Sequence, residues 1–349
     1  MISSVKNLIL NDCIEILDTE YINLNKLKNE KIFISGGTGF VGTWLLEMIC
    51  YLNEEYNFNT EVILLARNIS EFKKDKKHLS GKKHIAFIKK DIRYLTELPS
   101  DITYIIHAAA NPDNRQHSSD PITVMDIISR GTNNILSLAS SLPNIKKILN
   151  ISSGLIYGQQ PYDLIHIPES YQGSSNCSSI FSIYPEAKRF AEMLSTAYRN
   201  QYKLPIINAR PFTFLGPYQH INKPWAHTNF LRDSLLGGPI RITGNQNSVR
   251  GYMYASDMAY WFLKILADGK QGVPYNIGNP KGITLRDFAE KICEQYPNKI
   301  NIENITGNNL SLSRFVPDVT LATKSLGLKI FTPTDAAIRK TLSWYNKTL

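Results

Sequence analysis

Cysteine is scarce in this chain of 349 residues, which carries only four. They stand far apart with no paired spacing, at Cys13, Cys50, Cys177 and Cys293. A zinc site or a disulfide-stabilised fold needs closer pairs, so we expect no metal and a reducing compartment. Long apolar runs are lacking too, since residues 40–46 and 258–266 fall far short of the roughly 20 that cross a bilayer. The N-terminus has no secretory pattern, and we expect a cytoplasmic protein with no membrane partner.

Negative charge is outnumbered, because 39 Lys and Arg face 30 Asp and Glu and leave a formal net charge of +9. Two interpretations stay open: attraction to phosphate-bearing ligands or polyanions, or a lysine-rich surface that is only solvated. The densest lysine run, residues 73–83, contains no aromatic side chain. Single-stranded nucleic acids usually stack their bases on aromatics, so we expect no nucleic-acid partner.

Internal repeats are absent, and short β-branched runs alternate instead with helical periodicity. The expected strands cover residues 31–35, 61–66, 84–89, 103–107, 147–152 and 204–209. Helical patterns such as residues 42–52 and 132–141 lie between them. This alternation predicts an α/β fold with a Rossmann-type, doubly wound parallel sheet that is covered on both faces.

The chain divides into three predicted parts. Residues 1–30 form an N-terminal extension without an assigned role, in which residues 13–17 fit a packing helix. Residues 31–210 form the dinucleotide-binding domain, to which segments near residues 245–280 return, including a strand at 274–278. Residues 211–244 and 281–349 form a smaller lobe of loops and helices. That lobe is expected to cover the carboxyl ends of the strands, where open α/β sheets bind ligands.

A glycine-rich turn follows the first expected strand and precedes a helical pattern. Gly36 permits the tight turn, Gly39 lets the backbone approach a pyrophosphate, and Gly42 allows close packing of helix against strand. The helix N-terminus presents free N–H groups and a partial positive charge to the phosphates. The turn predicts a bound dinucleotide, contacted by Gly36, Thr38, Gly39, Phe40, Val41 and Gly42.

The choice between NAD and NADP depends on the end of the second strand. An acidic residue there would hold a ribose 2′-hydroxyl, but Arg67 stands in its place and suits a 2′-phosphate. We therefore expect NADP, with NAD as the alternative and a solvent-facing Arg67 as the structural explanation. Asp91 and Ile92 follow the third strand and are expected along the adenine. After His107, the small residues Ala108, Ala109 and Ala110 leave room for the cofactor.

Ser153, Tyr184 and Lys188 form the constellation that carries chemistry. Ser153 follows an expected strand, and Tyr184 and Lys188 are four residues apart, on one face of a helix. A phenol has an ordinary pKa of about 10 and is a poor base at neutral pH. The Lys188 cation and a positive nicotinamide ring are expected to lower that pKa, while Ser153 orients the reacting hydroxyl of the substrate.

Together these motifs resemble the extended short-chain dehydrogenase/reductase superfamily and, more narrowly, its nucleotide-sugar epimerase/dehydratase family. The resemblance covers about residues 30–330. It rests on the glycine turn, Asp91, His107 to Ala110, Ser152 to Gly158 and Tyr184 to Lys188. It continues through Arg210-Pro211-Phe212, Gly216-Pro217, Asn229-Phe230, Arg250-Gly251-Tyr252, Ser256-Asp257, Tyr275 to Gly278 and Arg314 to Asp318.

The resemblance implies a nucleoside-diphosphate (NDP) sugar as the substrate, bound by the second lobe. It suggests Asn229, Arg250 and Arg314 as diphosphate or nucleotide contacts and Asp318 as a ribose contact. An arginine fork suits phosphate oxygens, and a surface ion pair is the equally open explanation for each arginine. Tyr184, Lys188 and Pro211 are implied as cofactor contacts. A homodimer through two helices of the main domain is implied as well.

The chain departs from the family pattern at three places. Family members that act as 4,6-dehydratases carry an Asp-Glu pair where this chain has Gly154 and Leu155, which cannot move protons. Ile128 replaces an Asn that commonly precedes Gly131-Thr132, which affects the usual contacts of that helix but not hydride transfer. His220 and His227, where some relatives place an extra acid, are taken as loop histidines.

These observations predict an NAD(P)-dependent NDP-sugar 4-epimerase that works through a transient 4-keto sugar. An NADPH-dependent NDP-4-keto-sugar reductase is the alternative, because the same residues perform one half-reaction and Arg67 favours the consumed reductant NADPH. A 4,6-dehydratase is disfavoured by Gly154 and Leu155. A non-catalytic NADP-binding regulator is disfavoured by the intact Ser153, Tyr184 and Lys188.

Overall fold

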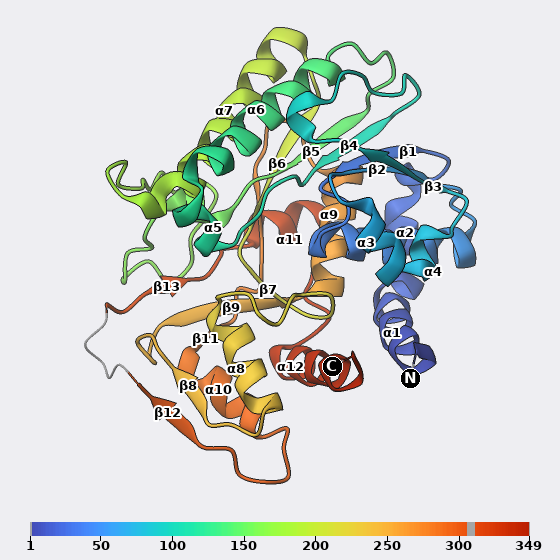
Figure 1. The fold of residues 1–349 in the computed structure, drawn as a ribbon. Helices are drawn as coiled ribbons and strands as arrows, with labels where there is room; N and C mark the ends of the chain where they lie inside the picture. Colours follow the sequence, from blue (N-terminus) through green and yellow to red (C-terminus); the bar gives the residue numbers. More distant parts are fainter. Residues whose placement is uncertain (1, 306–310, 349) are drawn as a thin grey trace.

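A seven-stranded parallel sheet lies at the centre of the computed structural model, which describes residues 2–305 and 311–348 (Figure 1). Its spatial order is β10-β6-β5-β4-β1-β2-β3. The strands are β1 (Lys31–Ser35), β2 (Glu61–Ala66), β3 (Ile85–Lys89), β4 (Tyr104–His107), β5 (Lys147–Ile151), β6 (Ile206–Pro211) and β10 (Tyr275–Ile277). Each named pair in this sheet runs parallel. Its central strands are almost wholly buried, which explains their unbroken apolar runs.

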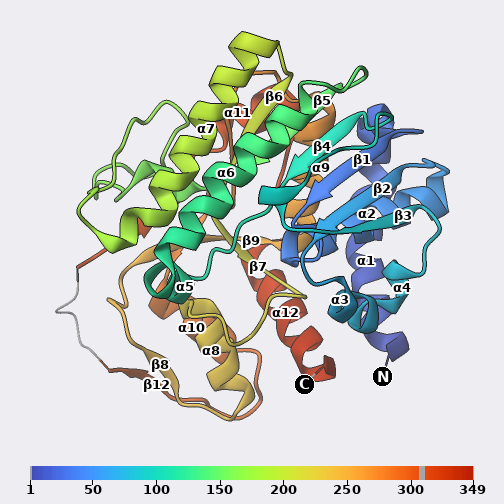
Figure 2. The ribbon, with the colours of Figure 1, turned by 45° about the horizontal axis from the view of Figure 1, so that its top comes forward.

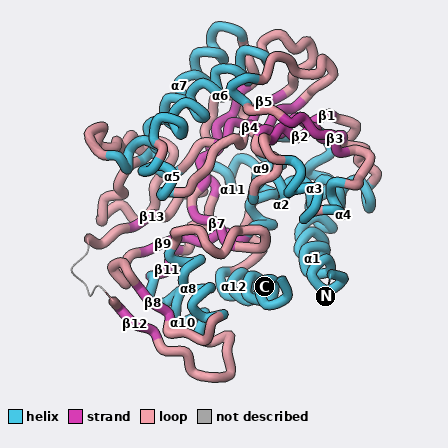
Figure 3. The backbone as a smooth tube through the Cα atoms, in the orientation of Figure 1, coloured by secondary structure: helices cyan, strands magenta, loops and turns pink. Residues whose placement is uncertain are grey.

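Helices cover both faces of this sheet (Figures 2 and 3). α6 (Pro121–Ala139) and α7 (Ile183–Tyr202) lie side by side on one face. α2 (Phe40–Tyr56) and α9 (Ala255–Asp268) pack together on the other. The doubly wound Rossmann-type sheet predicted from the sequence is therefore confirmed. The shorter helices α3 (Ile69–Asp75), α4 (Lys77–Ser80) and α5 (Asn114–Ser119) lie in its connections, and α11 (Thr320–Leu326) follows β13 and packs against β10 and α9.

The N-terminal extension is an integral part of the core. It forms α1 (Ile2–Glu20) and a 3₁₀ helix, η1 (Tyr21–Leu27). Ile9, Cys13 and Ile16 recur at helical spacing, and their burial against α2 and α9 explains why the segment folds. Asp12, only 1% exposed, accepts hydrogen bonds from Tyr254 Oη at 2.7 Å and Lys340 Nζ at 2.7 Å.

The smaller lobe has its own strands and its own apolar core (Figure 1). One sheet joins β7 (Thr213–Leu215), β9 (Val249–Tyr254), β11 (Gly282–Thr284) and β13 (Arg314–Phe315), and a second joins β8 (Ile240–Ile242) and β12 (Ile302–Asn304). Its helices are α8 (Ala226–Leu235), α10 (Leu285–Cys293) and α12 (Thr334–Thr348). The sequence predicted only loops and helices for residues 211–244 and 281–349, and this was wrong because strands of two or three residues leave no periodicity.

Within residues 2–305 and 311–348, no helix is both long and apolar enough to cross a bilayer. In the same part of the chain, no three His, Cys, Asp or Glu side chains are grouped so as to hold a metal ion. All four cysteines are free thiols.

Candidate active site

The glycine turn has the conformation that its sequence predicted. Gly36 has a φ of +70°, and a Cβ there would lie 2.7 Å from the carbonyl oxygen of Ala108. A Cβ on Gly42 would lie 2.3 Å from the carbonyl oxygen of Gly37, so the start of α2 packs directly on the turn. Gly39 is the N-cap of α2 and provides no side-chain cap, which leaves N–H groups for a ligand. This cradle fits a dinucleotide pyrophosphate.

Two cavities, of about 570 and 720 Å³, lie beside this turn. They meet along shared lining residues, which are Gly36, Arg67, Ala110, Asn111, Gln219 and His220. The smaller cavity is also lined by Asp91 and Ile92. The larger one contains Ser153, Tyr184 and Lys188. The two cavities therefore follow the path expected of an extended dinucleotide, from its adenosine to its reactive ring.

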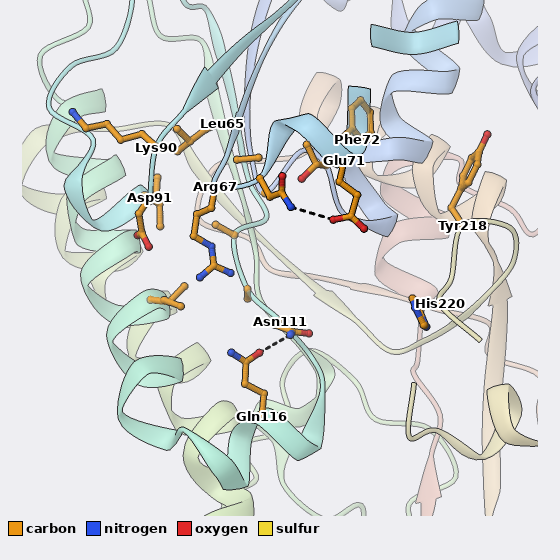
Figure 4. A pocket seen from close by; sticks show the side chains of 18 of the residues that line it. Leu65, Arg67, Glu71, Phe72, Lys90, Asp91, Asn111, Gln116, Tyr218 and His220 are labelled. Atoms are coloured by element: carbon orange, nitrogen blue, oxygen red, sulfur yellow. Dashed lines mark hydrogen bonds between the residues drawn. The ribbon is translucent and has the colours of Figure 1, made fainter. Parts of the chain in front are cut away.

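Arg67 reaches into the smaller cavity, between Asp91 and Asn111 (Figure 4). Its guanidinium makes no hydrogen bond or ion pair with other residues of the described chain, so its five donors are available. Asp91 is engaged, because it accepts from Arg93 Nε at 3.0 Å and Nη2 at 2.8 Å. These bonds are the main reason why the pKa of Asp91 is lowered, and the charge of Arg67 adds to the effect.

The structure brings Ser153, Tyr184 and Lys188 together in the larger cavity. Ser153 follows β5, and its Oγ accepts from the backbone N of Leu155 at 3.1 Å. Tyr184 and Lys188 share one face of the first turns of α7, and Pro185 is tolerated there because its missing N–H falls in the first turn. Lys188 Nζ lies 5.8 Å from the centroid of the Tyr184 ring and donates to the carbonyl oxygen of Ile151 at 2.7 Å.

Burial dominates the ionisation of both groups. It raises the pKa of the Tyr184 phenol above the ordinary value of 10.0, and a hydrogen bond with Ser153 opposes the rise. Burial lowers the pKa of Lys188 to about 8, and the charge of Glu192 opposes this shift. The lowered phenol pKa expected from the sequence is therefore not found in the protein alone, where burial outweighs the hydrogen bond with Ser153. The contribution of a positive nicotinamide ring stays a prediction.

A buried network that the sequence did not single out supports the floor of this cavity. His107, at the end of β4, bonds Ser35 Oγ through Nδ1 at 2.7 Å and Thr132 Oγ1 through Nε2 at 3.0 Å. Burial, aided by the charge of Lys188, lowers the pKa of His107 to about 3 and keeps it neutral. The network joins β1, β4 and α6 behind Ala108, which fixes the turn along which the cofactor is expected to pass.

The residues implied as substrate contacts lie at different places. Arg250 lines the larger cavity, where its guanidinium donates to Ser313 O at 3.1 Å and Ser313 Oγ at 2.8 Å. As far as the chain is described, the linings of the two cavities do not include Asn229, Arg314 or Asp318. These three roles stay predictions.

The loop before α8 supplies lining residues that sequence reasoning missed. Lys223 and Trp225 line the larger cavity, and their only signal in the sequence was a loop rich in polar and aromatic residues around Pro217 and Pro224. His220 lies in this loop as expected. His227 does not, because it is buried in the first turn of α8, where its ring bonds Gln219 Oε1 at 3.2 Å.

Comparison with known proteins places this site in a family. The model of the NAD dependent epimerase/dehydratase family matches residues 32–278. The chain belongs to this family. It is an enzyme of the extended short-chain dehydrogenase/reductase type, and the family description names NAD as the cofactor.

Members of the family with different reactions are similar to this enzyme. It is 31% identical to UDP-glucuronic acid decarboxylase 5 of Arabidopsis thaliana over an alignment of 301 residues. This alignment covers 86% of this chain and 84% of the decarboxylase. UDP-glucuronic acid decarboxylase 1 of Danio rerio is 25% identical, over 93% of this chain and 75% of its own. The fold is shared with UDP-N-acetylglucosamine 4-epimerase of Methanobrevibacter ruminantium, at a TM-score of 0.79 and 20% identity, over 92% of this chain and 100% of that one. UDP-glucuronic acid 4-epimerase of Bacillus cereus gives a TM-score of 0.78 at 18% identity, over 91% of this chain and 100% of the epimerase chain.

Gly154 and Leu155 occupy the two positions at which dehydratases of the family carry an Asp-Glu pair, and the structure leaves no free space for a carboxylate side chain at Gly154. A Cβ on Gly154 would lie 2.8 Å from the Phe212 ring, so an acidic side chain there would have to displace it. Leu155 lines the larger cavity with an apolar side chain. Among the described residues that line this cavity there is no Asp or Glu, whereas Arg67, Lys188, Lys223 and Arg250 are cationic. The cavity therefore suits an anionic ligand and lacks a carboxylate for acid/base work.

Proposed function

We propose that this enzyme is an NAD(P)-dependent NDP-sugar 4-epimerase of nucleotide-sugar metabolism. One observation carries the proposal: Ser153, Tyr184 and Lys188 share a cavity whose described lining holds no carboxylate. That set supports removal and return of hydride and a proton at a sugar alcohol. Loss of water or of a carboxyl group usually needs a further acid or base.

In the proposed reaction, Tyr184 takes the proton of the sugar 4-hydroxyl. Ser153 holds the same oxygen by a hydrogen bond, and the charge of Lys188 stabilises the phenolate. A bound nicotinamide would supply the hydride acceptor in its oxidised form and the hydride donor in its reduced form. Between the two transfers the 4-keto sugar turns within the cavity, so that hydride returns to the opposite face of C4 while Tyr184 gives the proton back to O4. The cationic lining, Arg250 above all, retains the nucleoside diphosphate during the turn.

Decarboxylation, the reaction of the named sequence relatives, is less well supported here. A 4-keto uronic acid is a β-keto acid that loses CO2 readily, and a positioned acid is needed only to direct the protonation of the enolate at C5. The family position that provides such a group holds Leu155, which is 38% exposed and carries no proton. The 31% identity to a decarboxylase thus supports the shared first step, oxidation at the sugar carbon. Which reaction follows that oxidation depends on the residues at the active site, such as Leu155.

The 4-epimerase proposal is tested with Tyr184→Phe and a panel of UDP-, dTDP-, GDP- and CDP-sugars. We expect the wild-type protein to interconvert two NDP-sugars that differ only in configuration at C4, without consuming added cofactor. NMR would monitor this interconversion. Tyr184→Phe should lower turnover by roughly 10²- to 10⁴-fold and leave cofactor affinity unchanged, because it removes only the proton acceptor. Turnover of the variant within twofold of wild type, on the scale of normal assay scatter, would contradict the role of Tyr184.

The reductase alternative is favoured by one specific residue, Arg67. An unpaired guanidinium at the end of β2 suits the 2′-phosphate of NADPH, which is the usual donor in net reductions. We propose NADP as the preferred cofactor, with NAD as the alternative. Arg67→Ala should weaken NADP binding by about 10- to 100-fold and NAD binding hardly at all, as calorimetry would measure. An unchanged NADP/NAD affinity ratio would refute this role.

The assembly and location of the enzyme are also proposals. We propose a homodimer through α6 and α7, because both helices expose large apolar side chains: Ile122, Met125, Phe190 and Met193. Exposed apolar groups on neighbouring helices are typical of a protein interface. A cytoplasmic location stays a prediction from the sequence.

A further inference from the structure

Tyr184 is stacked against a second aromatic ring that none of the motifs above includes. His117, from the short helix α5, lies with its ring centroid 4.5 Å from that of Tyr184 and its plane tilted by only 9°. Both side chains are buried, at 6% and 5% exposure. A residue far away in the sequence thus covers a face of the phenol that carries the chemistry.

The orientation of His117 is fixed by a hydrogen bond. Its Nε2 lies 2.8 Å from the backbone carbonyl oxygen of Asn111, which can only accept, so Nε2 carries the proton and donates. Burial lowers the pKa of His117, so the ring is neutral at physiological pH. A ring held at one edge in this way cannot rotate freely about its own axis. The plane that it offers to Tyr184 is therefore set by the backbone of the β4–α5 loop.

That loop is itself tightly held. Asp113 caps α5 by accepting from the backbone N of Arg115 at 3.1 Å, and its own N–H donates to Asn111 Oδ1 at 3.2 Å. Lys223, from the loop before α8, donates to Asp113 Oδ2 at 3.1 Å. Asn111 lines both cavities. The support of His117 is thus continuous with the walls of the cleft.

A simple space-filling role does not explain this choice of residue. The other buried members of the apolar cluster around Tyr184 are aliphatic: Val124, Ile128, Ala187 and Ala191. One more aliphatic group would fill the space without the cost of burying two ring nitrogens. Aliphatic groups, however, offer no flat surface, so they leave the tilt of the phenol ring loosely defined. The imidazole, oriented by Asn111, defines it.

We propose that His117 is a positioning residue for Tyr184: its oriented ring holds the phenol plane so that the hydroxyl stays directed at Ser153 and the substrate. The inference rests on the proposed role of Tyr184 in proton transfer. Proton and hydride transfer depend on near-attack geometry, so a phenol that tilts freely reacts less often without binding substrate less tightly.

The first arm of the test needs no substrate. Tyr184 is replaced by 3-fluorotyrosine in the full chain with NADP added, and the fluorine NMR line shape is recorded well below the melting temperature. We expect wild type and the neighbouring control Ser118→Ala to share one spectrum. His117→Ala should show an averaged or exchange-broadened line, and His117→Phe, which keeps a flat ring, should stay close to wild type. A His117→Ala spectrum that superimposes on wild type would overturn the proposal.

The second arm measures kcat and KM on the nucleotide sugar that the wild-type enzyme converts. His117→Ala should lower kcat by about 10- to 100-fold with KM nearly unchanged, and His117→Phe should recover most of the loss. An unchanged kcat in His117→Ala, or full recovery by the aliphatic His117→Leu, would show that a flat ring is not needed and that His117 at most fills space. Equal losses in His117→Ala and His117→Phe would also contradict positioning by a flat ring. If wild type converts no sugar of the panel, the proposed function fails, and the fluorine arm alone still decides the role of His117.

Discussion

Lys188 carries a charge in a place that water does not reach. Its side chain is 4% exposed, and one carbonyl oxygen, that of Ile151, takes the place of its hydration shell. A buried ammonium gives up its proton more easily than an exposed one, which is why the pKa of Lys188 is lowered to about 8. The positive charge of Lys188, which the proposed reaction uses, is thus present at neutral pH and is lost as the pH rises above about 8.

The pH dependence of turnover follows from this shift. Lys188 is charged below pH 8 and neutral above it, so the charged form that stabilises the phenolate disappears as the pH rises. We expect kcat to fall from about pH 8 upwards. Lys188→Met should lower kcat by roughly 100-fold or more at neutral pH and remove this alkaline limb. A steady-state kcat of the wild-type enzyme that stays constant to high pH would contradict this role of the Lys188 charge.

At the level of single residues, local motifs were predictable and distant partners were not. The spacing of Tyr184 and Lys188 sets them on one helix face whatever surrounds them, and the turn at Gly36 needs glycine for its own backbone. The stacking of His117 on Tyr184 depends on where α5 packs, which no local pattern encodes. His227 was placed in a loop because α8 begins without a capping side chain that would mark its start.

Among the elements, α9 illustrates a buried charge at a helix start. Asp257 lies in its first turn, and its Oδ1 accepts from the backbone N of Phe331 at 2.5 Å and of Thr332 at 3.3 Å. Burial nevertheless raises the pKa of Asp257 from 3.8 to about 6. The carboxylate therefore ties the segment before α12 to α9 at a cost in free energy that depends on pH.

The sign of this dependence is open to measurement. Because the folded-state pKa exceeds the unfolded value, the folded chain binds the proton more tightly, and stability falls as the pH rises from about 4 to about 6. Asp257→Asn keeps an Oδ1 acceptor and cannot ionise. Urea titrations measure the free energy of unfolding of both proteins at about pH 4 and about pH 7. We expect the difference between the variant and wild type to shift in favour of the variant by roughly 2–3 kcal/mol between these two pH values. An equal difference between the two proteins at both pH values would contradict the shift.

The elements of the main sheet were predictable because each strand is a buried apolar run of about five residues between turn signals. Two of them, β1 and β2, have the bounds expected from the sequence. The N-terminal helix was recognised only in part, since its function is to pack on α2 and α9, and those contacts are visible only in the fold.

For the whole molecule, the outer face of α6 and α7 is the surface of the proposed dimer (Figure 2). Phe190 and Met193 are 52% and 64% exposed on α7, and Ile122 is 80% exposed on α6. The cost of hydrating such a surface is removed when two copies cover each other.

The proposed dimer is tested with the double variant Phe190→Asp/Met193→Asp. We expect wild type to sediment as a dimer and the variant as a monomer, with dimer affinity reduced by about 100-fold or more because two charges would be buried unpaired. Leu236→Asp is the matched control, since Leu236 is 76% exposed but belongs to the smaller lobe. A wild-type monomer at micromolar concentration would refute the interface.

The position of Asp12 has a consequence for how the molecule can be divided. Through one carboxylate, the first helix is bonded both to Tyr254, at the junction between the lobes, and to Lys340, near the other end of the chain. A fragment limited to residues 32–278, the stretch that the family model matches, would leave the Tyr254 hydroxyl without its acceptor and uncover the apolar surface of α2 and α9. We therefore expect a fragment limited to residues 32–278 to be less stable than the full chain, because α1 and α12 contribute contacts to the same core.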